Sequence, residues 1–357
     1  MATESKFETK DGLQPGHDIF YTPDNASFYA TKPYSQLNPA QQEVRLLRLL
    51  PYSGQGLIEC ELLEATPLLN VKGRYTALSY CAGSPRETDV ILLNGTQFNV
   101  FASLGHALKQ IRNFWDQTFP DRECIVWIDQ ICINQNDIGE RSHQVRFMRE
   151  IYEYSEQVLA CLSTEDTDPK GMDWFLEVVK CEGRTAFGRN RSYFWGDLQD
   201  TKYVEGWVAF YDIVEAAWWK RAWVFQEFIV APTLYFIYGG RSVSWENFRR
   251  AFTAVFSAHS QVLDAGRKLP KKKHWELQDC NLDLLVQRTM GGGSDAIEKG
   301  EFMLRNKVDW SGSMDLKELL NHSRYCDCSD PRDRVFAFLG LANLHYGILP
   351  DYSQTLV

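Results

Sequence analysis

The chain has 357 residues, with 38 Lys or Arg against 47 Asp or Glu, and therefore carries a formal net charge of −9 at pH 7. Its 44% hydrophobic content, with 21 Phe, 16 Tyr and 11 Trp, excludes an intrinsically disordered chain. The negative charge argues against unspecific binding to nucleic acid or anionic membranes, because both repel an acidic protein. There is no apolar run long enough for a membrane span and no signal-peptide pattern at the start, so we expect a cytoplasmic protein.

The nine cysteines are scattered and lie mostly in apolar runs, which favours buried, reduced thiols. The spacing of the one close pair, Cys326 and Cys328, does not fit a zinc finger, and no CxxC or HxxxH accompanies it. We therefore expect no metal site.

The first part of the chain predicts an arm followed by strands. Residues 1–42 lack sustained periodicity and are rich in Pro, Asn, Ser and Tyr. Two apolar runs, 44–50 and 57–63, flank a turn with Gly and Pro and predict an antiparallel pair. Residues 75–80 predict a short buried strand, and Asn94-Gly95 between 90–93 and 97–100 predicts a hairpin with a type I′ turn.

The next segment predicts a βαβ unit. A helix is expected from Ser103, with this serine as its cap. Residues 124–129 are continuously apolar up to Asp129, as in a strand of a parallel sheet that is buried on both faces. A capping box at 137–140 then opens a helix whose buried face includes residues 145, 148 and 152, before another strand at 158–162.

The remainder predicts an insertion, a further strand and several helices. Residues 164–205 resemble an insertion, 204–219 a helix that continues through 221–227, and 234–238 a strand. Helices are expected at 245–265 and 315–321, and exposed loops at 268–273 and 291–294. We expect an α/β core at 43–240 with antiparallel N-terminal hairpins, and a mainly helical C-terminal extension at 241–357.

Three polar groups interrupt apolar segments, where an unpaired polar group is costly. Ser79 and Tyr80 end one predicted strand, Asp129 ends another, and Glu227 lies among Trp223, Val, Phe and Ile. Ligands of α/β sheets bind beyond the carboxyl ends of the strands, and a carboxylate among aromatic rings is suited to tuning for catalysis. We therefore expect Tyr80, Asp129 and Glu227 in one cleft.

Each of these residues also has a structural interpretation. Asp129 is equally suited to capping a turn through its own backbone bonds. Glu227 is a candidate ion-pair partner of Arg221, and Tyr80 a candidate packed ring with a solvated hydroxyl. Asn134 and Gln135, just after Asp129, fit a role in bracing the loop better than a catalytic one. The sequence leaves these alternatives open.

These residues carry a resemblance to the HET (heterokaryon incompatibility) domain of filamentous fungi. The blocks that resemble it are YTALSY at 75–80, WIDQICINQ at 127–135, ERSHQV at 140–145, RAWVFQE at 221–227, DPRDRVFAFLGL at 330–341 and PDYS at 350–353. One departure is visible, since the family usually reads Ser-Tyr-x-Trp-Gly where this chain has Ala82 before Gly83. The resemblance covers residues 44–352 discontinuously.

HET domains in turn resemble TIR domains, which have a flavodoxin-like fold and many of which cleave NAD at its nicotinamide–ribosyl bond. TIR domains carry a glutamate in a helix that reads roughly Trp-Cys-x-x-Glu-Leu, and Trp223 and Glu227 have the same spacing. The resemblance implies Glu227 as the principal catalytic carboxylate and Asp129 as its partner. It further implies a substrate-binding group made of Ser79, Tyr80, Trp127, Arg141, Arg221 and Trp223.

The chemistry needs little more than one carboxylate. Nicotinamide leaves as a neutral pyridine, so the protein has mainly to stabilise an oxocarbenium-like ribosyl centre and admit water. The resemblance therefore implies a fungal cell-death effector that uses NAD as substrate, needs no cofactor, and is activated by self-association or by an allelic or non-allelic partner. The rival hypothesis is a signalling module that acts through assembly alone.

Overall fold

The computed structural model describes residues 25–52, 56–84, 86–182, 201–268, 282–288, 294–343 and 347–354. Within them one mixed sheet has the strand order β11-β10-β9-β5-β8-β2-β3-β6-β7. Its strands are β2 (Leu47–Leu49), β3 (Ile58–Leu62), β5 (Thr76–Ser79), β6 (Thr88–Leu93), β7 (Thr96–Phe101), β8 (Cys124–Trp127), β9 (Gln157–Cys161), β10 (Leu234–Tyr238) and β11 (Arg241–Ser244). A small pair, β1 (Glu43–Val44) and β4 (Thr66–Pro67), lies apart from it. The α/β class is confirmed.

The parallel core of the sheet has the order expected for a doubly wound fold. Strands β8, β5, β9 and β10 are neighbours and mutually parallel, so the chain-order sequence across the sheet is second, first, third, fourth. This is the order that flavodoxin-like folds share. The predicted βαβ unit of β8 and β9 is present, but β5 lies between the two strands and pairs with both. Strands β5 and β9 are buried on both faces.

The N-terminal part of the sheet is antiparallel where the sequence predicts it. Strand β2 pairs antiparallel with β3 and with β8, and β6 forms a hairpin with β7. Asn94 and Gly95 have φ angles of 52° and 75°, the left-handed values that a type I′ turn requires. The described part of the arm, 25–42, contains helix α1 (Ala26–Ala30) and a 3₁₀ turn η2 (Pro39–Gln41), and Phe28 is buried.

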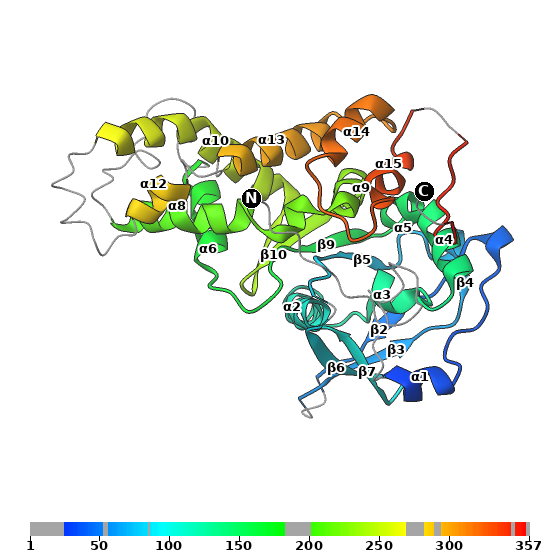
Figure 1. Cartoon of the computed structure of the whole chain (residues 1–357). Coiled ribbons are helices and arrows are strands. Elements are labelled where there is room, and N and C mark those ends of the chain that lie inside the picture. The colour runs from blue at the N-terminus through cyan, green and yellow to red at the C-terminus, as the bar shows by residue number, and fades with distance from the viewer. Residues whose placement is uncertain are drawn as a thin grey trace.

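Helices cover both faces of the parallel core. Helix α2 (Ala102–Thr118) lies on one face, and α5 (Met148–Glu153) and α9 (Ala222–Val230) lie on the other (Figure 1). Against expectation Ser103 does not cap α2: the helix starts one residue earlier, and the Ser103 hydroxyl donates to the carbonyl of Ala82 at 2.7 Å. The hydroxyl therefore ties α2 to the loop after β5.

Two predicted helices are each interrupted. The helix expected through 145–155 is divided at Phe147 into α4 (Ile138–Arg146) and α5. Asp137 caps α4, accepting the Glu140 N–H at 2.9 Å. The helix expected to run from 204 to 227 ends as α8 (Thr201–Val214), and a 3₁₀ turn η4 (Ala217–Lys220) and an extended Arg221 precede α9. This break turns α9 back across the sheet.

The C-terminal part is helical, as expected, and packs on α9. It comprises α10 (Trp245–Lys268), α12 (Leu282–Arg288), α13 (Ser294–Val308), α14 (Leu316–Ser323) and α15 (Asp333–Leu339), of which α13 and α15 contact α9 directly. Of the loops expected at 268–273 and 291–294, residues 269–273 and 291–293 lie outside the described residues, and the expectation is wrong for Lys268, the last residue of α10, and for Ser294, the first of α13. Helix α6 (Lys170–Glu182), at the start of the expected insertion, is part of the packed structure because Met172 and Phe175 are fully buried.

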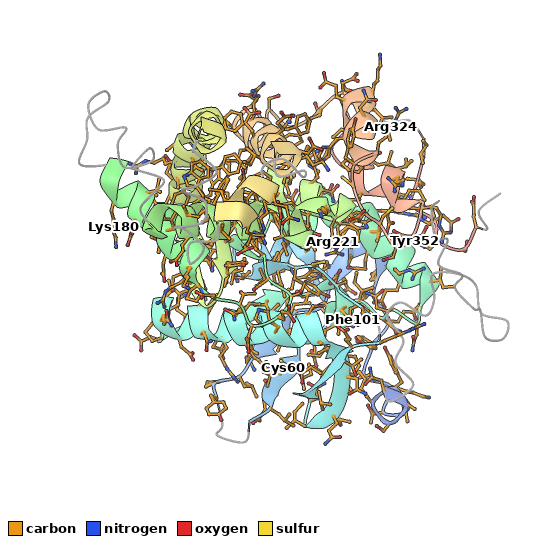
Figure 2. The ribbon with its side chains drawn as sticks, turned by 60° about the vertical axis from the view of Figure 1, so that its left-hand side comes forward. Cys60, Phe101, Lys180, Arg221, Arg324 and Tyr352 are labelled. Atoms are coloured by element: carbon orange, nitrogen blue, oxygen red, sulfur yellow. The ribbon has the colours of Figure 1, made fainter. Side chains whose placement is uncertain are left out.

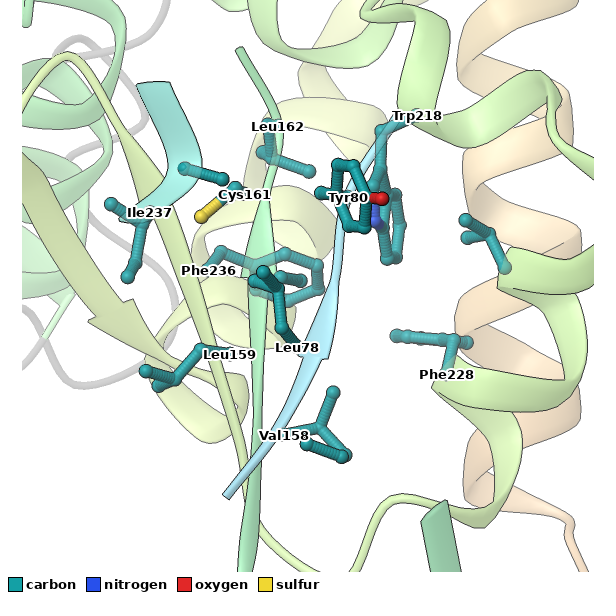
Figure 3. Close-up of a cluster of buried hydrophobic side chains, with 14 of the residues drawn as sticks. Leu78, Tyr80, Val158, Leu159, Cys161, Leu162, Trp218, Phe228, Phe236 and Ile237 are labelled. Carbon is teal, nitrogen blue, oxygen red and sulfur yellow. The ribbon is translucent and has the colours of Figure 1, made fainter. Parts of the chain in front are cut away.

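An aromatic cluster joins the sheet to α9. The rings of Trp218, Phe228 and Phe236 lie with centroids 5.8–6.3 Å apart, beside the aliphatic side chains of β5 and β9 (Figure 3). Such offset and edge contacts add to the stabilisation that burial itself provides. The cluster fixes α9 over the carboxyl half of the central strands, which is where its polar residues meet the sheet.

Candidate functional site

A buried hydrogen-bonded chain links β5 to α9. The Ser79 hydroxyl donates to Glu227 Oε2 at 2.5 Å and accepts the indole N–H of Trp218 at 2.9 Å. Glu227 is 3% exposed and Ser79 1% exposed. Because the indole N–H can only donate, the serine oxygen accepts it, and the serine hydroxyl hydrogen is available to donate to the Glu227 carboxylate. The last residue of β5 thus orients the Glu227 side chain.

The surroundings of Glu227 favour its neutral form. Burial raises the pKa of Glu227 to about 7, although Arg221 and the Ser79 hydroxyl act in the opposite direction. The Tyr152 hydroxyl also lowers it, while donating to the Leu78 carbonyl at 2.9 Å. No salt bridge within 4 Å joins Arg221 to Glu227 in the part of the chain described. Glu227 is therefore a carboxyl group that changes charge near neutral pH.

Asp129, Tyr80 and Arg221 lie beside Glu227 and interact with one another. Arg221 donates a hydrogen bond to the Tyr80 carbonyl, and its guanidinium lies 6.0 Å from the centroid of the Tyr80 ring. Burial raises the pKa of Asp129, and Arg221 opposes this shift. Burial also raises the pKa of Tyr80, and Asp129 adds to that effect. The structure thus brings the three predicted polar segments together at the carboxyl ends of β5 and β8.

Asp129 and its neighbours also brace the loop that follows β8. Asp129 Oδ1 accepts the Gln130 N–H at 2.7 Å at the start of the short helix α3 (Asp129–Cys132). Gln135 donates to the Asp129 carbonyl, and the Asn134 N–H donates to Glu140. The bracing role considered for Asn134 and Gln135 is therefore present. One Asp129 oxygen is engaged in the turn, as its structural interpretation requires.

A pocket of about 330 Å³ opens next to this cluster, a size at the lower end of that of small-molecule sites. Asp129, Arg141, Arg221 and Trp223 line it (Figure 2 shows Arg221 at this position). Glu227, Ser79 and Tyr80 do not line it, whereas Arg221, which donates a hydrogen bond to the Tyr80 carbonyl, does. The remaining lining residues are Cys81, Ala82, Gly83, Ile133, Gln135, Val145, Met148, Ala222, Asp327, Cys328, Ser329, Asp330, Asp333 and Tyr352.

Trp127 is a core residue and not part of the pocket. It is fully buried within β8, and its ring meets that of Tyr152 edge to face with centroids 5.7 Å apart. Its indole nitrogen has no hydrogen-bond partner among the described residues. Trp127 does not line the pocket, so nothing in its position brings it to a ligand there.

The outer wall of the pocket comes from the C-terminal part of the chain, to which the sequence interpretation gave no role. Tyr352 donates to Asp333 at 2.6 Å, and its backbone N–H donates to Ser142 of α4 at 3.1 Å. The Ala222 N–H donates to the Asp327 carbonyl, which joins this wall to the start of α9. The DPRDR and PDYS blocks at 330–334 and 350–353 were the sequence signal that would have located it.

Two further observations concern the protein as a whole. Seven of the cysteines, 60, 81, 124, 132, 161, 326 and 328, are free thiols and mostly buried, as expected. Among the helices that the structure describes, none combines the length and apolarity that crossing a membrane requires.

Comparison with known proteins agrees with this geometry. The family model for heterokaryon incompatibility protein (HET) matches residues 75–227, which run from the start of β5 to the buried glutamate of α9. Heterokaryon incompatibility protein 6, OR allele, of Neurospora crassa is 30% identical over 338 residues, covering 79% of this chain and 45% of that protein. The chain thus spans about half the length of this curated relative. No solved structure matches. Residues 75–227 of this chain are therefore identified as a HET (heterokaryon incompatibility) domain.

Proposed function

We propose that this chain is a fungal incompatibility effector that triggers cell death by cleaving NAD at the nicotinamide–ribosyl bond once it has assembled. The observation that carries the proposal is Glu227, a buried carboxyl held by Ser79 beside a pocket at the carboxyl edge of a parallel sheet. The name of the Neurospora relative supports the incompatibility role. The resemblance of HET to TIR domains supports the reaction.

In this proposal Glu227, Asp129 and Arg221 have separate roles in the reaction. The ionised Glu227 stabilises the positive charge that develops at the ribose as neutral nicotinamide departs, and water then completes hydrolysis. Asp129 faces the pocket and binds a ribose hydroxyl. Arg221 lines the pocket whereas Glu227 does not, so in this proposal the ribose reaches the carboxylate only after the Arg221 guanidinium moves aside.

The position of Arg221 provides a mechanism by which assembly activates the enzyme. Arg221 is an extended residue between η4 and α9, and the neighbouring backbone is bonded to the C-terminal wall at Asp327. A partner that displaces this wall also releases Arg221 and opens the path to Glu227. An enzyme held closed in this way does not consume the NAD of its own cell before it is activated.

A non-enzymatic signalling module is the second candidate, and one observation favours it. Glu227 is 3% exposed and is bonded to Ser79, so it already serves as a polar link between α9 and β5. In this function the cluster holds the fold together, and cell death results from contacts with partner proteins alone.

One experiment separates the two functions. The purified chain is incubated with NAD at concentrations that span its passage from monomer to oligomer, and nicotinamide, ADP-ribose and cyclic ADP-ribose are resolved. We expect nicotinamide release per molecule to rise with protein concentration, and Asp129→Asn to reduce it. Absence of nicotinamide release from the oligomer would exclude the enzyme and leave the module. A constant rate per molecule across the transition would exclude activation by assembly.

A further inference from the structure

The pocket contains two arginines in different situations. Arg221 is occupied, since it donates to the Tyr80 carbonyl and lies next to Asp129 and Glu227. The side chain of Arg141, on α4, makes none of the hydrogen bonds or ion pairs found among the described residues, whereas its backbone N–H donates to the Asp137 carbonyl at 2.9 Å. The Arg141 side chain is nevertheless buried, with the residue 7% exposed. Its Nε is enclosed without a partner, and its guanidinium carbon lies 4.5 Å from the centroid of the Tyr352 ring.

The carboxylates near Arg141 are already engaged by other groups. Asp330 binds Arg332, with Oδ2 2.6 Å from the arginine Nη2. Asp333 accepts the Tyr352 hydroxyl at 2.6 Å, and Asp137 caps α4. The buried Arg141 guanidinium is therefore stabilised by the Tyr352 ring and by the longer-range attraction of Asp330 and Asp333, but its N–H donors have no hydrogen-bond acceptor among the described residues and remain available to an external group.

The chemistry of the pocket restricts the external group that fits. A guanidinium takes phosphate oxygens through two parallel N–H bonds, a geometry that a lysine does not provide. The rings of Tyr352 and Trp223 line the same pocket and offer surfaces for a heterocyclic base or a sugar (Figure 2 shows Tyr352). Arg221 supplies a second positive charge on the wall formed by the start of α9.

We propose that Arg141 anchors the diphosphate of a nucleotide in this pocket, so that the site selects ligands by a phosphate group remote from the reacting bond. The inference rests on the proposed function for the identity of the substrate, since the diphosphate is that of NAD. It assigns the ligand class to nucleoside diphosphates, with Arg141 as the phosphate anchor and the aromatic wall as the base or sugar contact.

Binding is tested without turnover. Titration calorimetry with ADP-ribose, inorganic pyrophosphate and adenosine is performed on the parent chain and on Arg141→Gln, Arg141→Lys and Arg249→Gln. Arg249 is an arginine of α10 that is paired with Glu246. Arg249→Gln is the matched control, because it also removes one positive charge but does so away from the pocket. Thermal unfolding of the ligand-free proteins is measured in parallel.

We expect ADP-ribose to bind more tightly than adenosine, and pyrophosphate to compete with it. Arg141→Gln should weaken ADP-ribose roughly 10- to 100-fold, the range for a lost charge-assisted pair, and Arg141→Lys should weaken it less. Arg249→Gln should bind like the parent. Because the Arg141 side chain has no hydrogen bond or ion pair within the described residues and its main contact is the Tyr352 ring, Arg141→Gln should melt close to the temperature of the parent.

Three results would overturn the inference. They are equal affinity for adenosine and ADP-ribose, parental affinity in Arg141→Gln, and a large loss of thermal stability in Arg141→Gln without ligand. The two proposals fail separately. If ADP-ribose binds through Arg141 but NAD is never cleaved, the enzyme is excluded and the anchor stands. If NAD is cleaved with the same KM by Arg141→Gln, the anchor is excluded and the enzyme stands.

Discussion

Replacement of Glu227 by Gln tests whether this carboxyl is a strained functional group or a structural ion pair. Glutamine has the same shape, and its amide oxygen can still accept the Ser79 hydroxyl. It lacks the charge, however. The pKa of Glu227 is raised from 4.5 to about 7, mainly by burial, so ionisation at higher pH costs the folded state about 3 kcal/mol.

The sign of the pH effect follows from the raised pKa. The folded state holds the Glu227 proton more tightly than the unfolded state, so the stability linked to this proton is complete below pH 4.5. It is lost as the pH rises through about 7. Because glutamine does not titrate, the Glu227→Gln variant should be more stable than the parent at pH 8, by up to about 3 kcal/mol, and should match it near pH 4.

The assay combines denaturant unfolding between pH 4 and 8 with NAD turnover. If Glu227 stabilises the ribosyl cation, NAD turnover by Glu227→Gln should be roughly 10²- to 10³-fold lower than turnover by the parent, although the variant is the more stable protein at pH 8. Glu246→Gln is the matched control, since the Glu246 side chain is 60% exposed and its removal should change stability by less than about 0.5 kcal/mol.

Two outcomes would refute this reasoning. If Glu227→Gln loses about 3 to 5 kcal/mol at pH 8, Glu227 is the buried partner of Arg221 and the change has stranded a positive charge. If the variant is more stable than the parent yet cleaves NAD at the same rate, burial does destabilise the ionised Glu227 carboxylate, but Glu227 has no part in the reaction.

Two further predictions concern stability alone. His322 lies between Phe225 and Phe302, and burial lowers its pKa to about 4, so its contribution is present above pH 6.5 and declines as the pH falls. The loss should be about 2 kcal/mol at pH 5 in the parent and absent in His322→Phe, as measured by urea unfolding at pH 5 and 7. Asp137→Ala removes the cap of α4 and should cost about 1 kcal/mol in the same assay, whereas Asp137→Ser should retain most of it.

The elements that the sequence predicts correctly are those with a local signal. Strands β5, β8, β9 and β10 are continuous apolar runs, the β6–β7 turn is an Asn-Gly pair, and Asp137 precedes α4 at capping distance. The position of β5 between β8 and β9 has no such signal. It depends on which strands pair, which is a property of the whole chain.

The same distinction applies to the site. Asp129 and Glu227 stand out because each is a charged residue in an apolar run. The outer wall is marked in the sequence only by the blocks at 330–334 and 350–353, and its place in the pocket does not follow from them, because its contacts join residues such as Ser142 and Tyr352 that are 210 positions apart. The special position of Arg141 was equally hidden. An unpaired guanidinium is recognisable only when the partners of every neighbouring carboxylate are known.

The origin of each wall explains how one site can be both rigid and controllable. Ser79, Asp129 and Glu227 belong to, or directly follow, the central strands and the helix packed on them, and cores of this kind hold side chains in fixed positions. Asp327, Asp333 and Tyr352 belong to the C-terminal extension, which packs on α9 through α15 and joins the pocket through polar contacts such as that of Tyr352 with Asp333. In the proposed function, a partner that shifts the loop residues of this wall, such as Asp327 and Tyr352, changes access to the pocket while α15 stays packed on α9. This division is what an effector needs if it is to stay silent until it meets its partner.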